Sequence, residues 1–280
     1  MNIEKVKIVA DSSADLLTID DIPFEVAPLK IRTEEKEYVD DASLDVEKMV
    51  GELDEYTGES RTSCPSSEDW INAFADAEYV FCVTITSALS GSCNSAQIAK
   101  HDYEEEHPQR KVFVLDSRSA GPEIALLVEK IRELILEGLS FESVCEKITE
   151  YQKRTKLLFI LESMKNLANN GRVSHFTAKL AGILGIRLVG KASDEGTLEP
   201  IAKKRGEISA MTSIVENLRK LLYMGGKINI AHCNNESAAE KLKEMILKEF
   251  TLAKIQIYKC RGICSFYAER GGVLVGFETN

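Results

Sequence analysis

Several hydroxyl side chains and one glycine follow one another between residues 84 and 96. The apolar, β-branched run at 79–85 predicts a buried strand, and the sequence after the turn is typical of a helix. At such a strand-to-helix turn, free backbone N–H groups and the helix dipole attract an anion. Gly91 would let a ligand approach the backbone, and Ser90 and Ser92 would add hydroxyl donors. The alternative is that these serines only cap the helix.

A second hydroxyl pair, Thr62 and Ser63, stands shortly before a proline. Pro65 holds the residue before it extended. We therefore expect the pair on a fixed, irregular segment with its hydroxyls exposed. A plain turn is the alternative. If the pair converges with Ser90, the two clusters form one anion site.

A third polar segment, residues 11–16, is acidic and rich in hydroxyls, and it ends the first predicted strand at 6–10. Open α/β sheets place functional loops at the C-terminal ends of their strands. The same residue types are typical of a helix N-cap, which is the interpretation that we favour.

Strands and helices alternate through residue 153 and would position these turns. Apolar runs at 24–31 and 111–115 predict further strands. Residues 122–135 carry apolar side chains at spacings of three and four, with proline at the start, which indicates a helix with one buried face. Another helix is expected after Ser140. This alternation implies a largely parallel sheet with helices on both faces.

After residue 155 the pattern mixes hairpins with helices and is typical of an α+β fold. We expect strands at 156–161, 186–192, 197–202, 227–231, 255–258 and 272–277, and helices at 164–170, 177–184, 208–222 and 237–250. The helix at 208–222 should turn Ile208 and Leu222 inward, and Ser237 with Glu240 should form a capping box. We place a boundary near this change, which gives an N-terminal α/β lobe (1–155) and a C-terminal α+β lobe (156–280).

The composition excludes several classes of function. The chain has 280 residues, 44% of them hydrophobic and 29% charged, as in an ordinary soluble globular protein. A formal net charge of -10 argues against nucleic-acid binding, which needs a positive surface. No apolar run approaches the roughly 20 residues that span a bilayer. The first residues also lack the apolar core of a signal peptide. We expect a cytoplasmic protein without a transmembrane segment.

Cysteine and histidine usage leads to the same expectation. The seven cysteines are scattered, and no two are spaced as Cys-x-x-Cys, which suits buried thiols in a reducing compartment. The four histidines are not spaced with cysteine or aspartate as a zinc or iron site requires. A serine hydrolase, one rival function, would need a histidine-activated serine, and no Gly-x-Ser-x-Gly elbow is present. We therefore expect no metal site, and the sequence argues against a serine hydrolase.

Short motifs recur in a fixed order along the chain: Ile8-Val9-Ala10-Asp11-Ser12-Ser13-Ala14-Asp15-Leu16, Ala27-Pro28-Leu29, Tyr38-Val39-Asp40, Thr62-Ser63-Cys64-Pro65-Ser66, Leu89-Ser90-Gly91-Ser92, Asp116-Ser117, Gly171-Arg172-Val173-Ser174 and Lys204-Arg205-Gly206. In this order and spacing they resemble the DegV family of bacterial fatty-acid-binding proteins over nearly the full length. Each motif is short, so the resemblance depends on the set.

The resemblance implies two α/β lobes that enclose one long-chain fatty acid. It assigns the acid's carboxylate to Thr62 and Ser90. From the residues of the two turns we expect Ser63 and the Gly91 amide beside them. Family members present the bound acid to a separate ATP-binding subunit, related to dihydroxyacetone kinases, which phosphorylates it to an acyl phosphate. The chain would thus be a lipid-binding subunit, not an enzyme, with no cofactor besides its ligand. Ser92 would remain a helix cap.

Family arginines tied to phosphotransfer or docking fall on Arg172 and Arg205. The family's C-terminal His-x-Gly-Pro-Gly motif is replaced here by a segment that begins with Tyr267. Tyrosine can donate a hydrogen bond but, unlike histidine, carries no charge near neutral pH. Two functions therefore remain open beside the hydrolase: a subunit of a fatty acid kinase, and a stand-alone fatty acid carrier or sensor.

Overall fold

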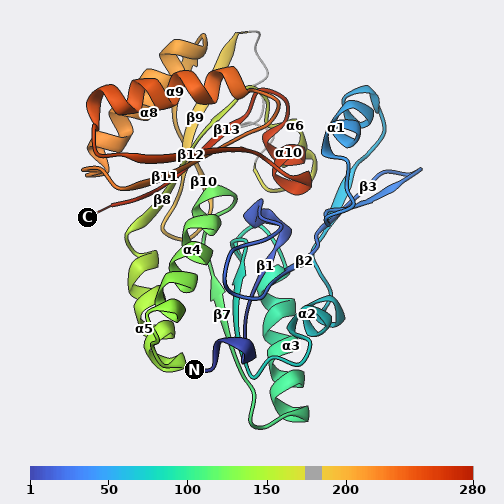
Figure 1. Cartoon of the computed structure of the whole chain (residues 1–280). Coiled ribbons are helices and arrows are strands. Elements are labelled where there is room, and N and C mark those ends of the chain that lie inside the picture. The colour runs from blue at the N-terminus through green and yellow to red at the C-terminus, as the bar shows by residue number, and fades with distance from the viewer. Residues whose placement is uncertain (174–184, 280) are drawn as a thin grey trace.

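A computed structural model of the chain describes residues 1–173 and 185–279 (Figure 1). The helix predicted at 177–184 lies outside these residues. Within them, no helix is long and apolar enough to cross a membrane.

The N-terminal half contains a four-stranded parallel sheet in the order β2-β1-β6-β7. Its strands are β1 (Val6–Asp11), β2 (Phe24–Ala27), β6 (Tyr79–Thr84) and β7 (Lys111–Asp116). The helices α2 (Ser67–Phe74) and α3 (Ser92–Glu106) pack on one face, and α4 (Pro122–Leu136) and α5 (Phe141–Gln152) on the other (Figure 1). Because the strands are parallel, the turns that follow β1, β6 and β7 meet at one edge of the sheet. The predicted α/β architecture is confirmed.

A small antiparallel sheet, in the order β4-β3-β5, stands beside the parallel one (Figure 1). It consists of β3 (Lys30–Arg32), β4 (Glu37–Val39) and β5 (Arg61–Ser63), and α1 (Val46–Glu55) follows β4. The run at 24–31 that predicted one strand is therefore split between two sheets. Pro28 stands at the break, where its missing N–H cannot continue a strand ladder.

The C-terminal half is a six-stranded mixed sheet in the order β10-β9-β8-β13-β11-β12, in which only β11 and β12 pair in parallel. Its strands are β8 (Thr155–Leu161), β9 (Ile186–Ala192), β10 (Leu198–Arg205), β11 (Lys227–His232), β12 (Lys254–Lys259) and β13 (Val273–Glu278). On one face lie α8 (Glu207–Lys220) and α9 (Glu236–Glu249). On the other face are α6 (Lys165–Asn169), α10 (Gly262–Ala268) and α1. Two short 3-10 helices, η1 (Ile3–Lys5) and η2 (Ser12–Ala14), flank β1.

Two local predictions for this half are wrong. Ile208 and Leu222 are 59% and 69% exposed, because Ile208 lies in the first turn of α8 and Leu222 lies beyond its end with φ +61°. Helix α9 begins at Glu236, one residue before the predicted cap. Asn235 is its N-cap and makes no side-chain capping bond, so the Ser237 capping box does not form.

Helix α4 joins the two halves. Its first turn lies against β13 so closely that a Cβ added to Gly276 would stand 2.4 Å from the backbone nitrogen of Glu123. Further along the helix, Lys227 of β11 forms an ion pair with Glu133 at 2.5 Å. Helix α4 thus packs against both the parallel sheet and the six-stranded sheet.

Candidate functional site

A cavity of about 270 Å³ lies between the two halves of the molecule. Most of its walls are apolar and come from β8, β10, β13, the helices α6 and α10, and the turn after β6. The apolar lining residues are Leu29, Ile85, Leu89, Ala120, Leu157, Phe159, Leu161, Leu167, Leu198, Ile263, Ala268 and Leu274. The polar and thiol groups of the lining are Thr62, Ser63, Cys64, Ser90, Gly91, Arg172, Cys264 and Tyr267. Such a lining suits a ligand with a long apolar body and one polar group.

The small sheet presents Thr62 to the cavity, where it meets Tyr267 of α10. Thr62 Oγ1 and Tyr267 Oη are 2.6 Å apart. Burial raises the pKa of Tyr267, so its phenol stays protonated at neutral pH. One of the two hydroxyls donates its hydrogen to the other. The pair therefore retains one hydrogen for a ligand.

The turn between β6 and α3 presents Ser90 and Gly91. Gly91 is the N-cap of α3 and has no side chain that could cap the helix. Ser90 Oγ accepts a hydrogen bond from the backbone N–H of Ser92 at 3.2 Å, which leaves its own hydrogen to donate. Ser92 is fully buried, and its hydroxyl donates to Asp11 at 2.5 Å. Ser90 thus faces the cavity, whereas Ser92 stabilises the turn through its buried hydrogen bond to Asp11. The prediction that Ser92 caps the helix is wrong, because Gly91 is the N-cap.

Asp11 ties the turn to β1. One carboxylate oxygen accepts hydrogen bonds from the backbone N–H of Ile85, at 2.8 Å, and from Ser92, so it holds both ends of the loop that carries Ser90. The other oxygen accepts from the backbone N–H of Ser13, which makes Asp11 the N-cap of η2 as predicted. Desolvation raises the pKa of this fully buried carboxyl, although its hydrogen bonds oppose the rise. The sequence predicted the cap but not the hydrogen bond that Asp11 accepts from Ser92.

Of the two candidate arginines, only Arg172 reaches the cavity. Its Nε donates to the carbonyl of Leu89 at 3.1 Å, next to Ser90, and its Nη1 donates to the carbonyl of Asn170. Arg205, at the end of β10, is exposed and is not part of the lining. The guanidinium of Arg172 therefore both fixes the turn and adds positive charge near it.

The two hydroxyl clusters lie in contact. A Cβ added to Gly91 would be 3.2 Å from Sγ of Cys64, so the segment after β5 touches the turn before α3. The structure thus brings Thr62, Ser63, Ser90 and Gly91 to one cavity wall. Cys64 was not among the predicted site residues, because nothing in its spacing signals a ligand contact.

In the described parts of the chain, residues 1–173 and 185–279, no group of three or more His, Cys, Asp or Glu side chains is placed to hold a metal ion. The polar groups of the cavity are hydroxyls, thiols and one guanidinium. Hydroxyl and guanidinium donors suit an anionic group such as a carboxylate.

Comparison with known proteins identifies the family. The model of a family described as "Uncharacterised protein, DegV family" matches residues 5–280. The chain belongs to the DegV family. A DegV domain-containing protein of Streptococcus pneumoniae strain R6 is 46% identical over 276 residues, which cover 97% of this chain and 98% of the relative.

Two solved DegV structures are close in fold. A DegV family protein from Eubacterium eligens, loaded with heptadecanoic acid, superposes with a TM-score of 0.97 at 41% identity, covering 98% of this chain and all of that one. The Fatty Acid Kinase (Fak) B3 protein of Streptococcus pneumoniae, loaded with linoleic acid, also gives 0.97, at 46% identity and with 99% and 100% coverage. Both the parallel sheet and the second lobe are thus those of DegV structures.

Proposed function

We propose that this DegV protein binds one long-chain fatty acid in the cavity between its lobes, residues 1–155 and 156–280. The observation that carries the proposal is the combination of a long apolar lining with hydroxyl donors grouped on one wall. Fatty acids held by the relatives from Eubacterium eligens and Streptococcus pneumoniae support it.

The acyl chain supplies most of the binding free energy. Burying about fifteen methylenes at roughly 0.8 kcal/mol each gives about 12 kcal/mol. Association and ordering of the chain consume a large part of this. A net value near 8 kcal/mol corresponds to a Kd around the micromolar range. The head group therefore needs to contribute little to affinity, and its contacts mainly decide which end of the ligand lies at the polar wall.

The carboxylate of the acid would lie against Thr62 and Ser90, with Ser63 and the backbone N–H of Gly91 beside it. Ser90 has a free hydroxyl hydrogen, and the Thr62–Tyr267 pair has another. The N-terminus of the 15-residue helix α3 adds the positive end of its dipole. Without such donors, a buried carboxylate would lose several kcal/mol or become protonated. These donors keep it ionised.

An ionised carboxylate is the nucleophile required for a second step, its phosphorylation by a partner protein. We propose that a separate, dihydroxyacetone-kinase-like subunit supplies ATP. A carboxylate oxygen then attacks the γ-phosphorus, the bond to the β-phosphate oxygen breaks, and acyl phosphate and ADP are formed. In this scheme the chain presents the substrate and does not catalyse the transfer. Arg172, Arg205 and Tyr267 are the candidates for the partner-facing surface. The similarity to the Streptococcus pneumoniae Fak B3 protein supports this assignment.

A stand-alone fatty acid carrier or sensor is the second candidate. The observation that favours it is the uncharged Tyr267 at the cavity, in the position of the family's histidine. Mixing the protein with a kinase subunit, labelled ATP and fatty acid separates the two functions. Formation of labelled acyl phosphate supports the kinase subunit, and its absence with an active kinase supports the carrier.

Lipid extraction from the purified protein, followed by mass spectrometry, tests fatty acid binding directly. We expect about one long-chain acid per chain. Ser90→Ala should weaken acid binding about 10- to 100-fold, because a hydrogen bond to a charged group contributes roughly 1.5–3 kcal/mol. Ser87→Ala is the matched control, since Ser87 is exposed in the same turn and outside the cavity lining. Ser90→Ala protein with unchanged acid retention and acyl phosphate formation would refute the head-group assignment.

A further inference from the structure

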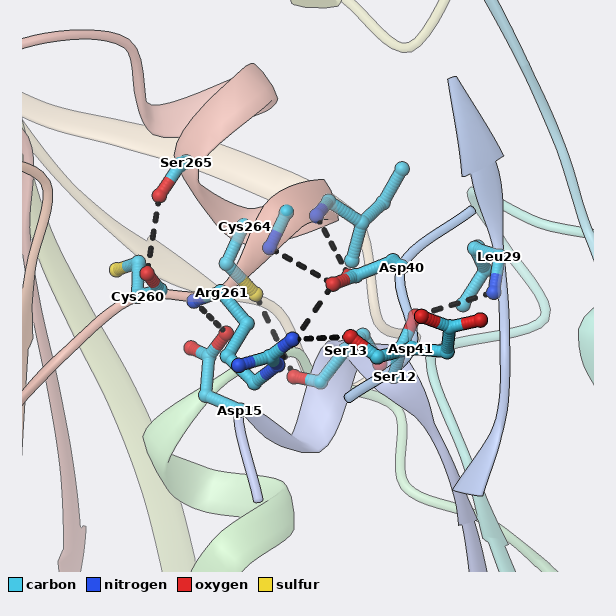
Figure 2. Close-up of polar contacts among 12 residues, drawn as sticks. Ser12, Ser13, Asp15, Leu29, Asp40, Asp41, Cys260, Arg261, Cys264 and Ser265 are labelled. Atoms are coloured by element: carbon cyan, nitrogen blue, oxygen red, sulfur yellow. Dashed lines mark hydrogen bonds and ion pairs between the residues drawn. The ribbon is translucent and has the colours of Figure 1, made fainter. Parts of the chain in front are cut away.

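The start of helix α10 is held by two aspartate side chains from the distant N-terminal half (Figure 2). Asp15 accepts a hydrogen bond from the backbone N–H of Arg261 at 2.7 Å. Asp40 accepts one from Gly262 at 2.9 Å and one from Ile263 at 2.8 Å, each on a different oxygen. Asp40 is fully buried, and Asp15 is 7% exposed. Three successive N–H groups that a helix start leaves unpaired are thus satisfied by side chains outside the helix.

The close approach of Asp40 requires glycine at the first position of α10. A Cβ added to Gly262 would stand 2.7 Å from Oδ1 of Asp40 and 2.6 Å from Cδ2 of Leu44. The contact with Asp40 would push the carboxylate away from the helix, and the Leu44 side chain would have to move as well. The pair Asp40–Gly262 therefore acts as a matched contact between the loop after β4 and α10.

The same small sheet meets α10 at two points. Asp40 directly follows β4 and binds the start of the helix, whereas Thr62, on β5, binds Tyr267 near its end. Strand β3 lies between β4 and β5, and Asp40 stands two residues beyond Tyr38, which is level with Thr62, so the two positions are about 12 Å apart. Five residues of helix advance by about 7.5 Å. The side chains at the two points bridge the difference, and both hydrogen bonds are present, so the sheet holds both ends of α10 at once.

From this geometry we propose that Asp40 is a positioning residue for the head-group site. By fixing the start of α10, it sets the distance between Tyr267 Oη and Thr62 Oγ1 and thereby the selectivity of the cavity for a carboxylate. The inference rests on the proposed fatty acid site, because Thr62 and Tyr267 are assigned to the carboxylate there.

The change Asp40→Asn should disturb this distance while leaving the helix in place. Asparagine keeps one acceptor oxygen but presents an NH₂ group to the other backbone N–H, so one of the two bonds is lost and two donors face each other. Helix α10 keeps the bond from Arg261 to Asp15 and the contact of Cys264 Sγ with the carbonyl of Ser13 at 3.4 Å. The start of α10 would shift, and the Thr62–Tyr267 hydrogen bond would lengthen with it.

The test compares two ligands with the same chain, hexadecanoic acid and hexadecan-1-ol, delivered from cyclodextrin. Their Kd values are measured in the wild type, Asp40→Asn, Tyr267→Phe and the double variant, well below each variant's melting temperature. We expect the ratio of alcohol Kd to acid Kd to fall about tenfold in each single variant. The double variant should show no further fall, because both changes act through one contact. A general loss of stability would weaken both ligands alike and leave the ratio unchanged.

Asp41→Asn is the matched control, because among the described residues the Asp41 side chain bonds only within its own loop, to the backbone N–H of Ser43 at 2.8 Å and to the Ser43 hydroxyl. Its ratio should equal that of the wild type. If Asp40→Asn fails to fold, Gly262→Ala replaces it, since it displaces the same carboxylate from the other side.

Two results would overturn the inference while the proposed function stands. One is a folded Asp40→Asn or Gly262→Ala protein with the wild-type ratio. The other is a double variant whose ratio falls by the product of the two single effects. A wild-type protein that binds acid and alcohol equally would instead overturn the proposed head-group site, and the positioning role with it.

Discussion

Replacing Asp15 with asparagine should flatten the dependence of the protein's stability on pH. Asp15 Oδ1 accepts the hydrogen bond from Arg261, but no residue that the structure describes makes a hydrogen bond with the buried Oδ2. Desolvation raises the pKa of this carboxyl from 3.8 to about 8, against the opposing effect of the Arg261 bond. The native state therefore keeps Asp15 neutral at pH values where the unfolded chain has it ionised.

Asp15 takes up a proton when the chain folds, and this sets the sign and size of its effect on the free energy of unfolding. Between about pH 4 and pH 8 the native state binds one proton more than the unfolded state at this residue, so the free energy of unfolding falls as pH rises. The fall is about 1.4 kcal/mol for each pH unit within this window. Below about pH 4 both states are neutral, and above about pH 8 the full penalty is reached. Asparagine is neutral throughout and keeps the acceptor for Arg261.

Urea unfolding of the lipid-free protein at pH 5, 6, 7 and 8 measures the effect. Trp70 is the only tryptophan and is fully buried, so its fluorescence reports unfolding. Subtracting the wild-type free energy from that of Asp15→Asn cancels the other titrating groups. We expect the difference to change by about 2–3 kcal/mol between pH 5 and pH 7, in favour of the variant at higher pH. The exposed Asp20, changed to asparagine, serves as control. A pH-independent difference for Asp15→Asn would refute the neutral, desolvated carboxyl.

Three further predictions concern the turn, the lobe contact and the cavity. Ser92→Ala should lower the free energy of unfolding by about 1–3 kcal/mol, because buried Asp11 loses a donor, and an unchanged urea midpoint would contradict this. Gly276→Ala should cost at least about 1–3 kcal/mol in the same assay, since its Cβ would collide with the backbone at the start of α4; wild-type stability would show that the contact is looser. Loading with hexadecanoic acid should slow iodoacetamide labelling of Cys64, in the cavity lining, and leave Cys145, outside it, unaffected. Peptide mass spectrometry reads both rates, and equal slowing of both thiols would refute ligand protection.

The sequence predicted most elements but not their partners. Hydrophobic spacing located the α4 helix and the strands of the parallel sheet, because burial of one face imposes a period. It did not reveal that 24–31 divides between two sheets, since both pieces are extended and apolar. Hydrophobic spacing also wrongly placed Ile208 and Leu222 in the core. Periodicity does not show which residues at the ends of a helix extend past the sheet on which the helix packs. Contacts between distant segments decide both points.

The candidate site was predicted through the turns that carry it. Hydroxyls after a buried strand identified Ser90, and a rigid proline-flanked segment identified Thr62. That these two clusters meet in one cavity follows from the packing of the small sheet against the turn after β6, which the spacing of residues does not encode. The hydrogen bonds from Ser92 to Asp11 and from α10 to Asp40 could not be predicted either. They join residues that are 81 and 222 positions apart in the sequence, and only the folded structure brings these together.

The position of β13 has a consequence for how the protein is made. This strand, residues 273–278, lies in the middle of the six-stranded sheet, between β8 and β11. During synthesis, β8, β9 and β10 leave the ribosome well before β13. Until β13 emerges, the edge of β8 that pairs with it stays unpaired. The second lobe, and with it the roof of the cavity, can close only after β13 has emerged. Until translation has passed this strand, a nascent chain lacks one wall of the cavity, and chains that stop short of it present open sheet edges to chaperones and proteases.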